Sequence, residues 1–292
     1  PAIYAGYLIR IRPILIFSDY LNTVMNSSYY RNWCYNVKTD AVNQSNINAQ
    51  KLSQLMIPIP PLKEQERIVV EVAKWISLID TIKNSKEDLQ TTIKQAKSKI
   101  LNLAIHGELV PQDPNDEPAI ELLKRINPDF TPCDNGHYTQ LPEGWAICKM
   151  KQITSITNGK SQKNVETLNG IYPIYGSGGV IGRANQYLCI AGSTIIGRKG
   201  TINNPIFVEE HFWNVDTAFG LKANDAILDK YLYYFCLSFD FSKLDKSTAM
   251  PSLTKTSIGN VLIPIPPYKE QERIVAKIDM VLDTMNEILR AV

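Results

Sequence analysis

One phrase occurs twice in this chain and constrains its architecture more than any other feature. IPIPPLKEQERIV spans residues 57–69 and IPIPPYKEQERIV spans residues 263–275, with Leu62 replaced by Tyr268 as the single difference. The proline pair in each copy ends an extended segment, and the acidic residues that follow suit the positive N-terminal end of a helix. We therefore expect a strand, a sharp corner and a helix at both places.

The first copy opens a long helix with a heptad repeat. Its apolar residues recur at alternating steps of four and three, and only Lys86 interrupts the series. They are Ile68, Val72, Trp75, Ile79, Ile82, Leu89, Ile93, Ala96, Ile100 and Leu103. Gly107 is a suitable C-cap, so we expect a helix of about 44 residues, or roughly 66 Å at 1.5 Å per residue.

The second copy opens a helix with the same spacing, formed by Ile274, Ile278, Val281, Met285, Ile288 and Val292. Two helices with matching seams are expected to pack as an antiparallel coiled coil. An isolated heptad helix is more often an oligomerisation rod, but these helices alternate with globular segments, which favours a spacer. The predicted fold class is α+β, with mixed α/β domains alternating with the two long helices.

The repeat extends upstream of the shared phrase. SDYLNTVMNS (18–27) is similar to DKYLYYFCLS (229–238), and SNINAQKLSQLM (45–56) is similar to PSLTKTSIGNVL (251–262). The repeating unit is therefore a globular domain followed by a long helix. The first copy has far fewer residues before its helix than the second, and the chain opens on Pro1 rather than Met, so we expect a truncated first domain.

Composition places the chain among globular proteins and argues against several classes. The hydrophobic content is 44%, and no apolar run approaches the roughly 20 residues that cross a bilayer, so we expect a cytoplasmic protein. The five scattered cysteines form no Cys-x-x-Cys pair, which argues against a disulfide framework or a zinc cluster. A net charge of +2 is too small to indicate a nucleic-acid binder, so any such surface must be local.

Four stretches of the sequence, taken together, are specific enough to indicate a protein family. Besides the repeated phrase, they are ILNLAIHGELVPQDPNDEPAIELLKRI (100–126), LPEGWAICKMKQITSITNGKS (141–161) and YPIYGSGGVIGRANQYL (172–188). In combination they resemble the DNA-specificity (S) subunit of type I restriction-modification enzymes, along essentially the whole chain. In that family two target-recognition domains alternate with two conserved helices, and each domain reads one half of a split DNA site.

The resemblance implies a division of the chain into five parts. Residues 1–61 would be the C-terminal remnant of a first target-recognition domain, and 62–107 the first conserved helix. A linker with a short helix would span 108–140, the second recognition domain 141–267, and a truncated second conserved helix 268–292.

The resemblance also implies a non-catalytic subunit of a DNA methyltransferase and endonuclease complex. Its partners would be double-stranded DNA, methyltransferase (M) subunits and restriction (R) subunits, and truncated chains could associate with each other. The catalytic partners would bring S-adenosylmethionine, ATP and magnesium, and we expect this chain to bind no cofactor or metal itself.

Three polar loops are the candidate DNA contacts, because Lys and Arg bind phosphates and polar side chains on loops read bases. The first holds Lys160, Ser161, Gln162 and Lys163; the second holds Arg198, Lys199 and Asn203; the third holds Lys246, Ser247, Thr248, Ser252 and Lys255. For the first two loops the alternative to a DNA contact is a turn between strands that has no binding partner. In the third, helix capping explains several of the Ser and Thr residues equally well.

Charged residues at the start of each long helix are the candidate docking surface for partner subunits. They are Lys63, Glu64, Glu66, Arg67 and Glu71 in the first copy, and Lys269, Glu270, Glu272 and Arg273 in the second. Their near-identity favours a symmetric partner, although solvation alone also explains outward charges.

Two rival functions remain open from the sequence. A coiled-coil adaptor would have no DNA specificity. A methyltransferase could use IPPY (265–268), but Ile265 stands where a polar acceptor of a flipped base is required, which favours a strand-to-helix corner. GSGGVIG (176–182) lacks the third glycine of a dinucleotide fingerprint, and no Walker-type phosphate loop occurs.

Overall fold

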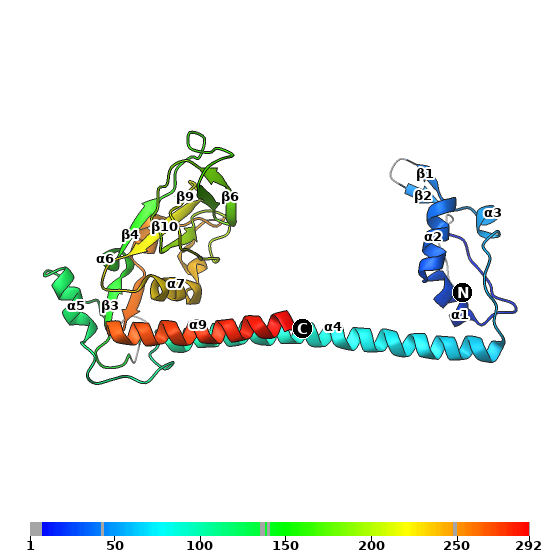
Figure 1. Ribbon diagram of the computed structural model, residues 1–292, viewed down its shortest axis with the longest axis horizontal. Helices are drawn as coiled ribbons and strands as arrows, with labels where there is room; N and C mark the ends of the chain where they lie inside the picture. The colour runs from blue at the N-terminus through cyan, green and yellow to red at the C-terminus, as the bar shows by residue number, and fades with distance from the viewer. Residues whose placement is uncertain (1–7, 42–43, 135–137, 139–140, 248–249, 292) are drawn as a thin grey trace. The chain divides into compact units, whose positions relative to one another are not determined.

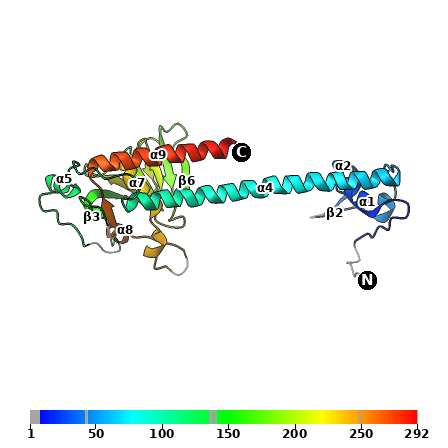
Figure 2. The same cartoon turned by 90° about the horizontal axis from the view of Figure 1, so that it is seen from below.

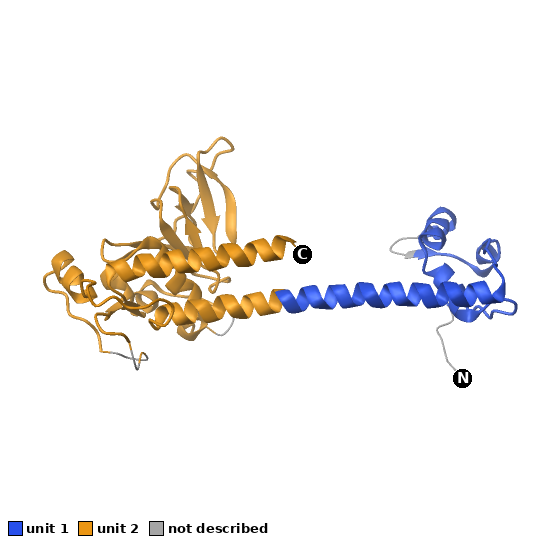
Figure 3. Ribbon diagram, turned by 60° about the horizontal axis from the view of Figure 1, so that its bottom comes forward, with its two compact units in different colours: residues 1–89 blue, residues 90–292 orange. Residues whose placement is uncertain are grey.

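The computed structural model describes residues 8–41, 44–134, 138, 141–247 and 250–291 (Figure 1). These residues form two compact units, Pro1–Leu89 and Gln90–Val292, which are coloured separately in Figure 3. Helix α4 (Leu62–Ile105) is shared, since its first turns belong to unit 1 and its last turns to unit 2 (Figure 3). In the described part of the chain, no helix combines the length and the apolar character needed to span a membrane.

Unit 1 is small and mainly helical. It consists of α1 (Ser18–Met25), α2 (Ser28–Val37), the antiparallel pair β1 (Thr39–Ala41) and β2 (Gln44–Asn46), α3 (Ala49–Leu52) and the first part of α4. Two helices begin at polar caps: Ser27 accepts a hydrogen bond from the Tyr30 backbone, and Asn48 accepts one from Lys51. Tyr20, Leu21 and Val24 of α1 supply its buried apolar side chains among the described residues.

The described residues of unit 2 form three sheets. The largest has the strand order β4-β10-β7-β8 and is antiparallel throughout, the second has the order β6-β5-β9, and β11 pairs with β3. The strands are β3 (Ala146–Lys149), β4 (Thr154–Asn158), β5 (Tyr172–Gly176), β6 (Gly179–Ala184), β7 (Ser193–Gly197), β8 (Ile206–Val208), β9 (Trp213–Asn214), β10 (Ala218–Ala223) and β11 (Leu262–Ile265). The helices besides α4 are α5 (Ala119–Ile126), α6 (Met150–Ile153), α7 (Asp229–Ser238), α8 (Lys255–Gly259), α9 (Tyr268–Ala291) and the 3-10 turn η1 (Phe241–Leu244).

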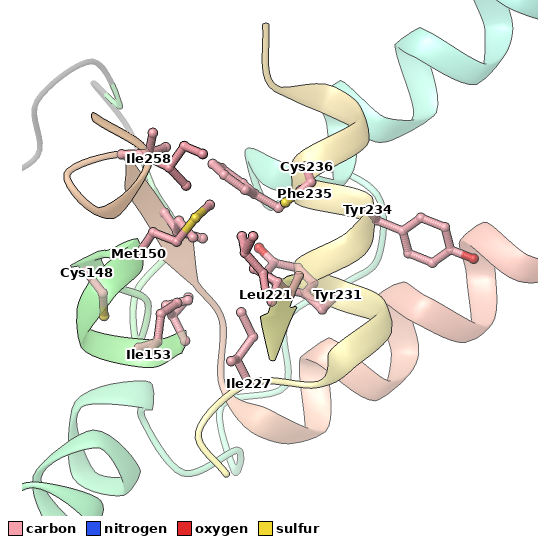
Figure 4. Close-up of a cluster of buried hydrophobic side chains, with 14 of the residues drawn as sticks. Cys148, Met150, Ile153, Leu221, Ile227, Tyr231, Tyr234, Phe235, Cys236 and Ile258 are labelled. Atoms are coloured by element: carbon pink, nitrogen blue, oxygen red, sulfur yellow. The ribbon is translucent and has the colours of Figure 1, made fainter. Parts of the chain in front are cut away.

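The core of unit 2 joins the sheets to the helices. Helix α7 contacts both the four-stranded sheet and α9, and its residues Tyr231, Phe235 and Cys236 point into the apolar cluster drawn in Figure 4. Met150 of α6 and Ile258 of α8 enter the same cluster from other segments. The predicted α+β class, with mixed domains and long helices, is confirmed.

The two long helices meet inside unit 2. There the last turns of α4 lie beside α9 and run in the opposite direction (Figure 2), and Lys97 Nζ donates to Asn286 Oδ1 over 3.0 Å. Leu101 and Ala104 of α4 share a buried cluster with Ile274 and Ile278 of α9. This segment shows the predicted antiparallel packing, although the buried α4 residues, Leu101 and Ala104, each lie one position after a residue of the predicted heptad series.

The repeated phrase forms the same corner in both units. Gln65 and Gln271 are almost fully buried, and each side chain accepts a hydrogen bond from the N-cap residue of an earlier helix, α1 or α7. Phe17 N–H donates to Gln65 Oε1 at 2.7 Å, and Leu228 N–H donates to Gln271 Oε1 at 2.8 Å. Each amide nitrogen also donates back to the proline corner, to Pro60 O at 2.8 Å or Pro266 O at 3.1 Å.

A tyrosine completes each corner. Tyr20 Oη donates to Pro58 O, and Tyr231 Oη donates to Pro264 O, both over 2.9 Å. Buried backbone groups that miss their partners are costly, so these side chains satisfy the polar groups that a proline corner leaves open. The repeated sequence therefore forms a repeated corner, in which a short helix, an extended segment and a long helix are held together.

Replacing Gln271 by Ala is expected to lower the free energy of unfolding of unit 2 by about 3 kcal/mol, because the Leu228 N–H and two carbonyl groups lose their partners in a buried site. Chemical denaturation followed by circular dichroism measures this change. Lys269→Ala is the matched control, since Lys269 is exposed on the same helical turn, and its effect should stay within about 0.5 kcal/mol. Equal unfolding midpoints for the two variants would contradict the role assigned to the corner.

Candidate nucleic-acid interface

The structure brings the second and third candidate loops together. Lys199 and Ser252 form an isolated antiparallel bridge, Gly200 N–H donates to Pro251 O at 3.0 Å, and Leu253 N–H donates to Arg198 O at 2.8 Å. Residues separated by about fifty positions in sequence therefore share one backbone ladder. Lys199 is exposed beside this ladder, and Lys246 is exposed in the third loop.

The first loop joins this group through the turn between β9 and β10. Lys160 N–H donates to Asn214 O at 2.9 Å, and Trp213 Nε1 donates to Lys160 O at 3.0 Å. The same turn accepts from the second loop, because Arg198 N–H donates to Thr217 O at 2.7 Å. Residues 213–218 thus connect the first loop to the second, and all three loops belong to one continuous network of backbone hydrogen bonds.

Two glycines shape these loops. A Cβ at Gly159 would lie 1.8 Å from Val215 O, so only glycine allows the first loop to approach the turn so closely. Gly200 has φ 77° and open space around it, and this left-handed conformation is costly for other residues. The hairpin-turn alternative for the second loop therefore has a physical basis, and it leaves Lys199 exposed at the turn.

The candidate side chains differ in how free they are. Lys160, Ser161, Lys163, Lys199, Lys246, Ser247 and Lys255 are exposed, whereas Gln162, Arg198 and Ser252 are half-buried, and Thr248 lies outside the described residues. The guanidinium carbon of Arg198 lies 5.8 Å from the centre of the Phe219 ring. A cation held over an aromatic face has less freedom to move, which pre-orients Arg198 at the edge of the sheet.

Both polar atoms of the Asn203 side-chain amide are hydrogen-bonded to other residues of unit 2. Its Nδ2 donates to Asp240 Oδ1 at 2.7 Å, and its Oδ1 accepts from Phe241 N–H at 2.7 Å. Hydrogen bonds from Ser242 and Asn203 hold the pKa of Asp240 below its usual value. Asn203 therefore ties the second loop to the start of η1, and a base contact by the same amide would compete with these bonds.

Asp245 organises the third loop, and sequence reasoning missed it. Its Oδ1 accepts from Ser247 N–H at 3.0 Å and from Ser252 N–H at 3.1 Å, and the Ser247 hydroxyl lies 2.7 Å away. These hydrogen bonds lower the pKa of the Asp245 carboxyl. An Asp two residues before a Ser is a recognised signal for a side-chain-to-backbone turn, and this signal could have identified it.

The prediction that all the docking residues are exposed charges is wrong for Glu270. Glu270 is only 1% exposed, and its carboxylate accepts from Trp145 Nε1 and Gln112 Nε2, each at 3.0 Å. Burial raises the pKa of this carboxyl, and the two hydrogen bonds oppose that effect. The heptad pattern could not reveal this, because Gln112 and Trp145 lie more than a hundred residues before Glu270 in the sequence and reach it only through the fold.

The other predicted docking charges remain at or near the surface. Lys269 pairs with Glu272 at 2.9 Å on the exposed side of α9, Glu64 pairs with Arg67, and Arg273 pairs with Asp116 at 2.5 Å. Lys63, Glu66 and Glu71 are exposed. The pairs Lys269–Glu272 and Glu64–Arg67 are exposed and contribute little to stability, whereas the Asp116 side chain of the third pair is only 8% exposed.

The methyltransferase-like motif IPPY forms the strand-to-helix corner that the sequence favoured. IPPY spans the end of β11, the two buried prolines of the corner and the first residue of α9, and Ile265 is buried in the strand. Among the described side chains, no three His, Cys, Asp or Glu residues lie close enough together to hold a metal ion. Cys148, Cys189 and Cys236 are buried, and burial raises the pKa of the Cys148 and Cys189 thiols to about 12.

A comparison with known families accounts for most of the chain. The model of the type I restriction modification DNA specificity domain matches residues 17–91 and 142–292. The chain belongs to this specificity family. The two matched stretches are the two places where a globular segment runs into a heptad helix through the repeated corner.

Curated members of the specificity family are distant in sequence. The EcoAI specificity subunit of Escherichia coli is 24% identical over 80% of this chain and 54% of its own length. The EcoKI specificity subunit of Escherichia coli strain K12 is 24% identical over 91% of this chain and 58% of its own length. The chain thus spans little more than half the length of these relatives.

Solved structures of the specificity family show the same fold. A chain from the work described as "Structural basis underlying complex assembly and conformational transition of the type I R-M system" matches 95% of this chain and 66% of its own length, with a TM-score of 0.71 and 19% identity. The HsdS subunit from Thermoanaerobacter tengcongensis matches 94% of this chain and 64% of its own length, with a TM-score of 0.57 and 18% identity.

Replacing Asp245 by Ala is expected to release the third loop, because the backbone amides of Ser247 and Ser252 lose a charged acceptor. Hydrogen exchange at Ser252 should accelerate by at least about 10-fold, the change expected when a hydrogen bond to a charged group is lost. Exchange measured by mass spectrometry or NMR tests this. Asp225→Ala, an exposed carboxylate elsewhere in unit 2, is the control and should leave exchange at Ser252 unchanged.

Proposed function

We propose that this chain is the sequence-reading subunit of a type I restriction-modification complex and reads DNA with the three loops of unit 2. The observation that carries the proposal is the convergence of these loops: Lys199 and Ser252 share a bridge, and residues 213–218 connect Lys160 to Arg198. Membership of the specificity family supports the same role.

The chemistry of the loops suits duplex DNA. Exposed lysines on neighbouring loops would neutralise phosphates and set the position of the domain on the duplex. Serines and Gln162 between them can donate and accept hydrogen bonds, which is what reading base edges requires. The loops extend from a packed sheet and are cross-linked by backbone bonds, so the contacts would be positioned with little loss of entropy on binding.

The duplication within the chain supports a bipartite target as part of this proposal. Both units carry the same glutamine corner and the same tyrosine bond, so we infer that unit 1 belongs to a second reading domain. Two such domains would read two halves of a split site, as the resemblance implies. Because this chain spans only part of the length of its relatives, the complete first domain is itself part of the proposal.

The subunit would act by positioning enzymes rather than by catalysis. We propose that the exposed charges of Lys63, Glu66, Lys269 and Glu272 help to dock methyltransferase subunits, with restriction subunits joining the larger assembly. Those partners would supply S-adenosylmethionine, ATP and magnesium. We place this assembly in the cytoplasm, where it would meet its DNA.

Replacing Arg198 and Lys199 together by Ala is expected to weaken binding to a selected DNA site by at least about 10-fold. A plot of the logarithm of the binding constant against the logarithm of the salt concentration should also become less steep. The magnitude of its slope should fall by about 2, or roughly 1 for each lost phosphate contact. The measurement is fluorescence anisotropy at two salt concentrations on a duplex enriched from a random pool, with and without a cognate methyltransferase subunit.

The double variant Lys124→Ala and Lys277→Ala is the matched control, since it removes two exposed cations from the helices α5 and α9 and should bind DNA as tightly as the native chain. Failure to enrich any sequence, even with the methyltransferase subunit present, would favour an adaptor without DNA specificity. Equal losses in both double variants would show that charge alone, and not the loop surface, governs binding.

A further inference from the structure

The glycine-rich motif GSGGVIG (176–182) forms the tip of the hairpin between β5 and β6. Gly176 and Gly179 are paired across the two strands, so Ser177 and Gly178 form the turn. A Cβ added at Gly178 would meet nothing within 4 Å among the described residues, and the φ of Gly178 lies outside the left-handed region. Neither packing nor backbone strain requires glycine at this position, whereas the close approach of another molecule to the backbone would.

Two aliphatic side chains next to the turn are open to solvent. Val180 is 58% exposed and Ile181 is 55% exposed. The strand pairs Ile174 with Gly182 and Tyr175 with Val180, which leaves Ile181 as the extra residue of a β-bulge. Bulges redirect side chains and are frequent beside functional sites. The hairpin therefore presents two neighbouring aliphatic side chains that contribute little to the core of unit 2.

The hairpin adjoins the loops to which DNA reading is assigned above. Val215 N–H donates to Tyr175 O at 2.9 Å, and a Cβ at Gly176 would lie 3.8 Å from the Val215 side chain. The backbone oxygen of Val215 lies against Gly159 of the first loop. Val215 thus contacts the hairpin and the first loop, and Arg198 of the second loop donates its N–H to the same turn. The hairpin tip is therefore continuous with the candidate DNA surface.

The charges around the hairpin tip favour a polyanion. Residues 159–163, 176–183 and 198–203 contain no Asp or Glu. Their exposed cations are Lys160, Lys163, Arg183 and Lys199. The exposed carboxylates close to them are Asp216 in the turn and Glu166 beside Gly182, so the cations are in excess. An aliphatic tip among exposed cations is complementary to duplex DNA, whose phosphates surround grooves that contain apolar base edges.

We propose that this hairpin enters the major groove and that Val180 and Ile181 contact thymine methyl groups there. The inference rests on the proposed function and adds a specificity-determining element to it. The major groove is about 12 Å wide and admits a two-stranded β-ribbon, and the C5 methyl of thymine is the apolar group that lies on its floor. Gly178 at the tip lets the backbone come close to the bases, while lysines of the two neighbouring loops bind the flanking phosphates.

The test combines a change in the DNA with a change in the protein. Each thymine of the duplex enriched from a random pool is replaced in turn by deoxyuridine, which removes only the C5 methyl group. For the native chain with the cognate methyltransferase subunit, at least one replacement should weaken binding about 4-fold, the loss expected for one buried methyl group. The double variant Val180→Ala and Ile181→Ala should bind the thymine duplex about 10-fold more weakly, and that replacement should then have no further effect.

The double variant Ile126→Ala and Met280→Ala is the matched control, because it shortens two exposed apolar side chains on α5 and α9. It should keep the native affinity and the native response to deoxyuridine, and circular dichroism checks that both double variants are folded.

Three outcomes would each overturn the inference: a response to deoxyuridine that persists in the hairpin variant, no response in the native chain, or a selected site without thymine. The proposed function is tested separately by the variant of Arg198 and Lys199. If that variant loses binding while the hairpin variant still responds to deoxyuridine, the hairpin contact fails and the reading role of the loops stands.

Discussion

A buried glutamine at the start of each long helix is the interaction on which the rest of this structure depends. Gln65 and Gln271 each receive the N–H of a preceding helix and return a hydrogen bond to the proline corner. A proline pair supplies a rigid turn but no N–H donors, so the carbonyls around it must be satisfied by side chains. The glutamine does this and sets the direction in which the heptad helix leaves each domain.

The two copies of the repeated corner have different surroundings. At the start of α9, Gln112 and Trp145 donate hydrogen bonds to Glu270, and Arg273 pairs with Asp116. Around the start of α4, the equivalent Glu64 and Arg67 pair with each other. A repeated sequence therefore has one covered and one open copy.

Much of the candidate DNA surface was predictable, but its assembly was not. The basic loops stand out in sequence because glycine, lysine and serine cluster between apolar strands. Their meeting depends on the order of strands in the sheet, which places β4, β10 and β7 side by side. Asp245 and Asn203 support the loops through bonds to partners that the sequence order does not reveal, and Glu270 was misjudged because its cover comes from a distant segment.

The sequence by itself determined the duplicated corner, the helix starts at Leu62 and Tyr268, the α+β class and the identity of the exposed basic loops. These features follow from local rules, since proline, glycine and heptad spacing act over a few residues. Only the tertiary structure decided which loops lie together and which repeated charges are buried. Those outcomes depend on contacts between distant segments, whose geometry is set by packing and by the need to satisfy buried polar groups.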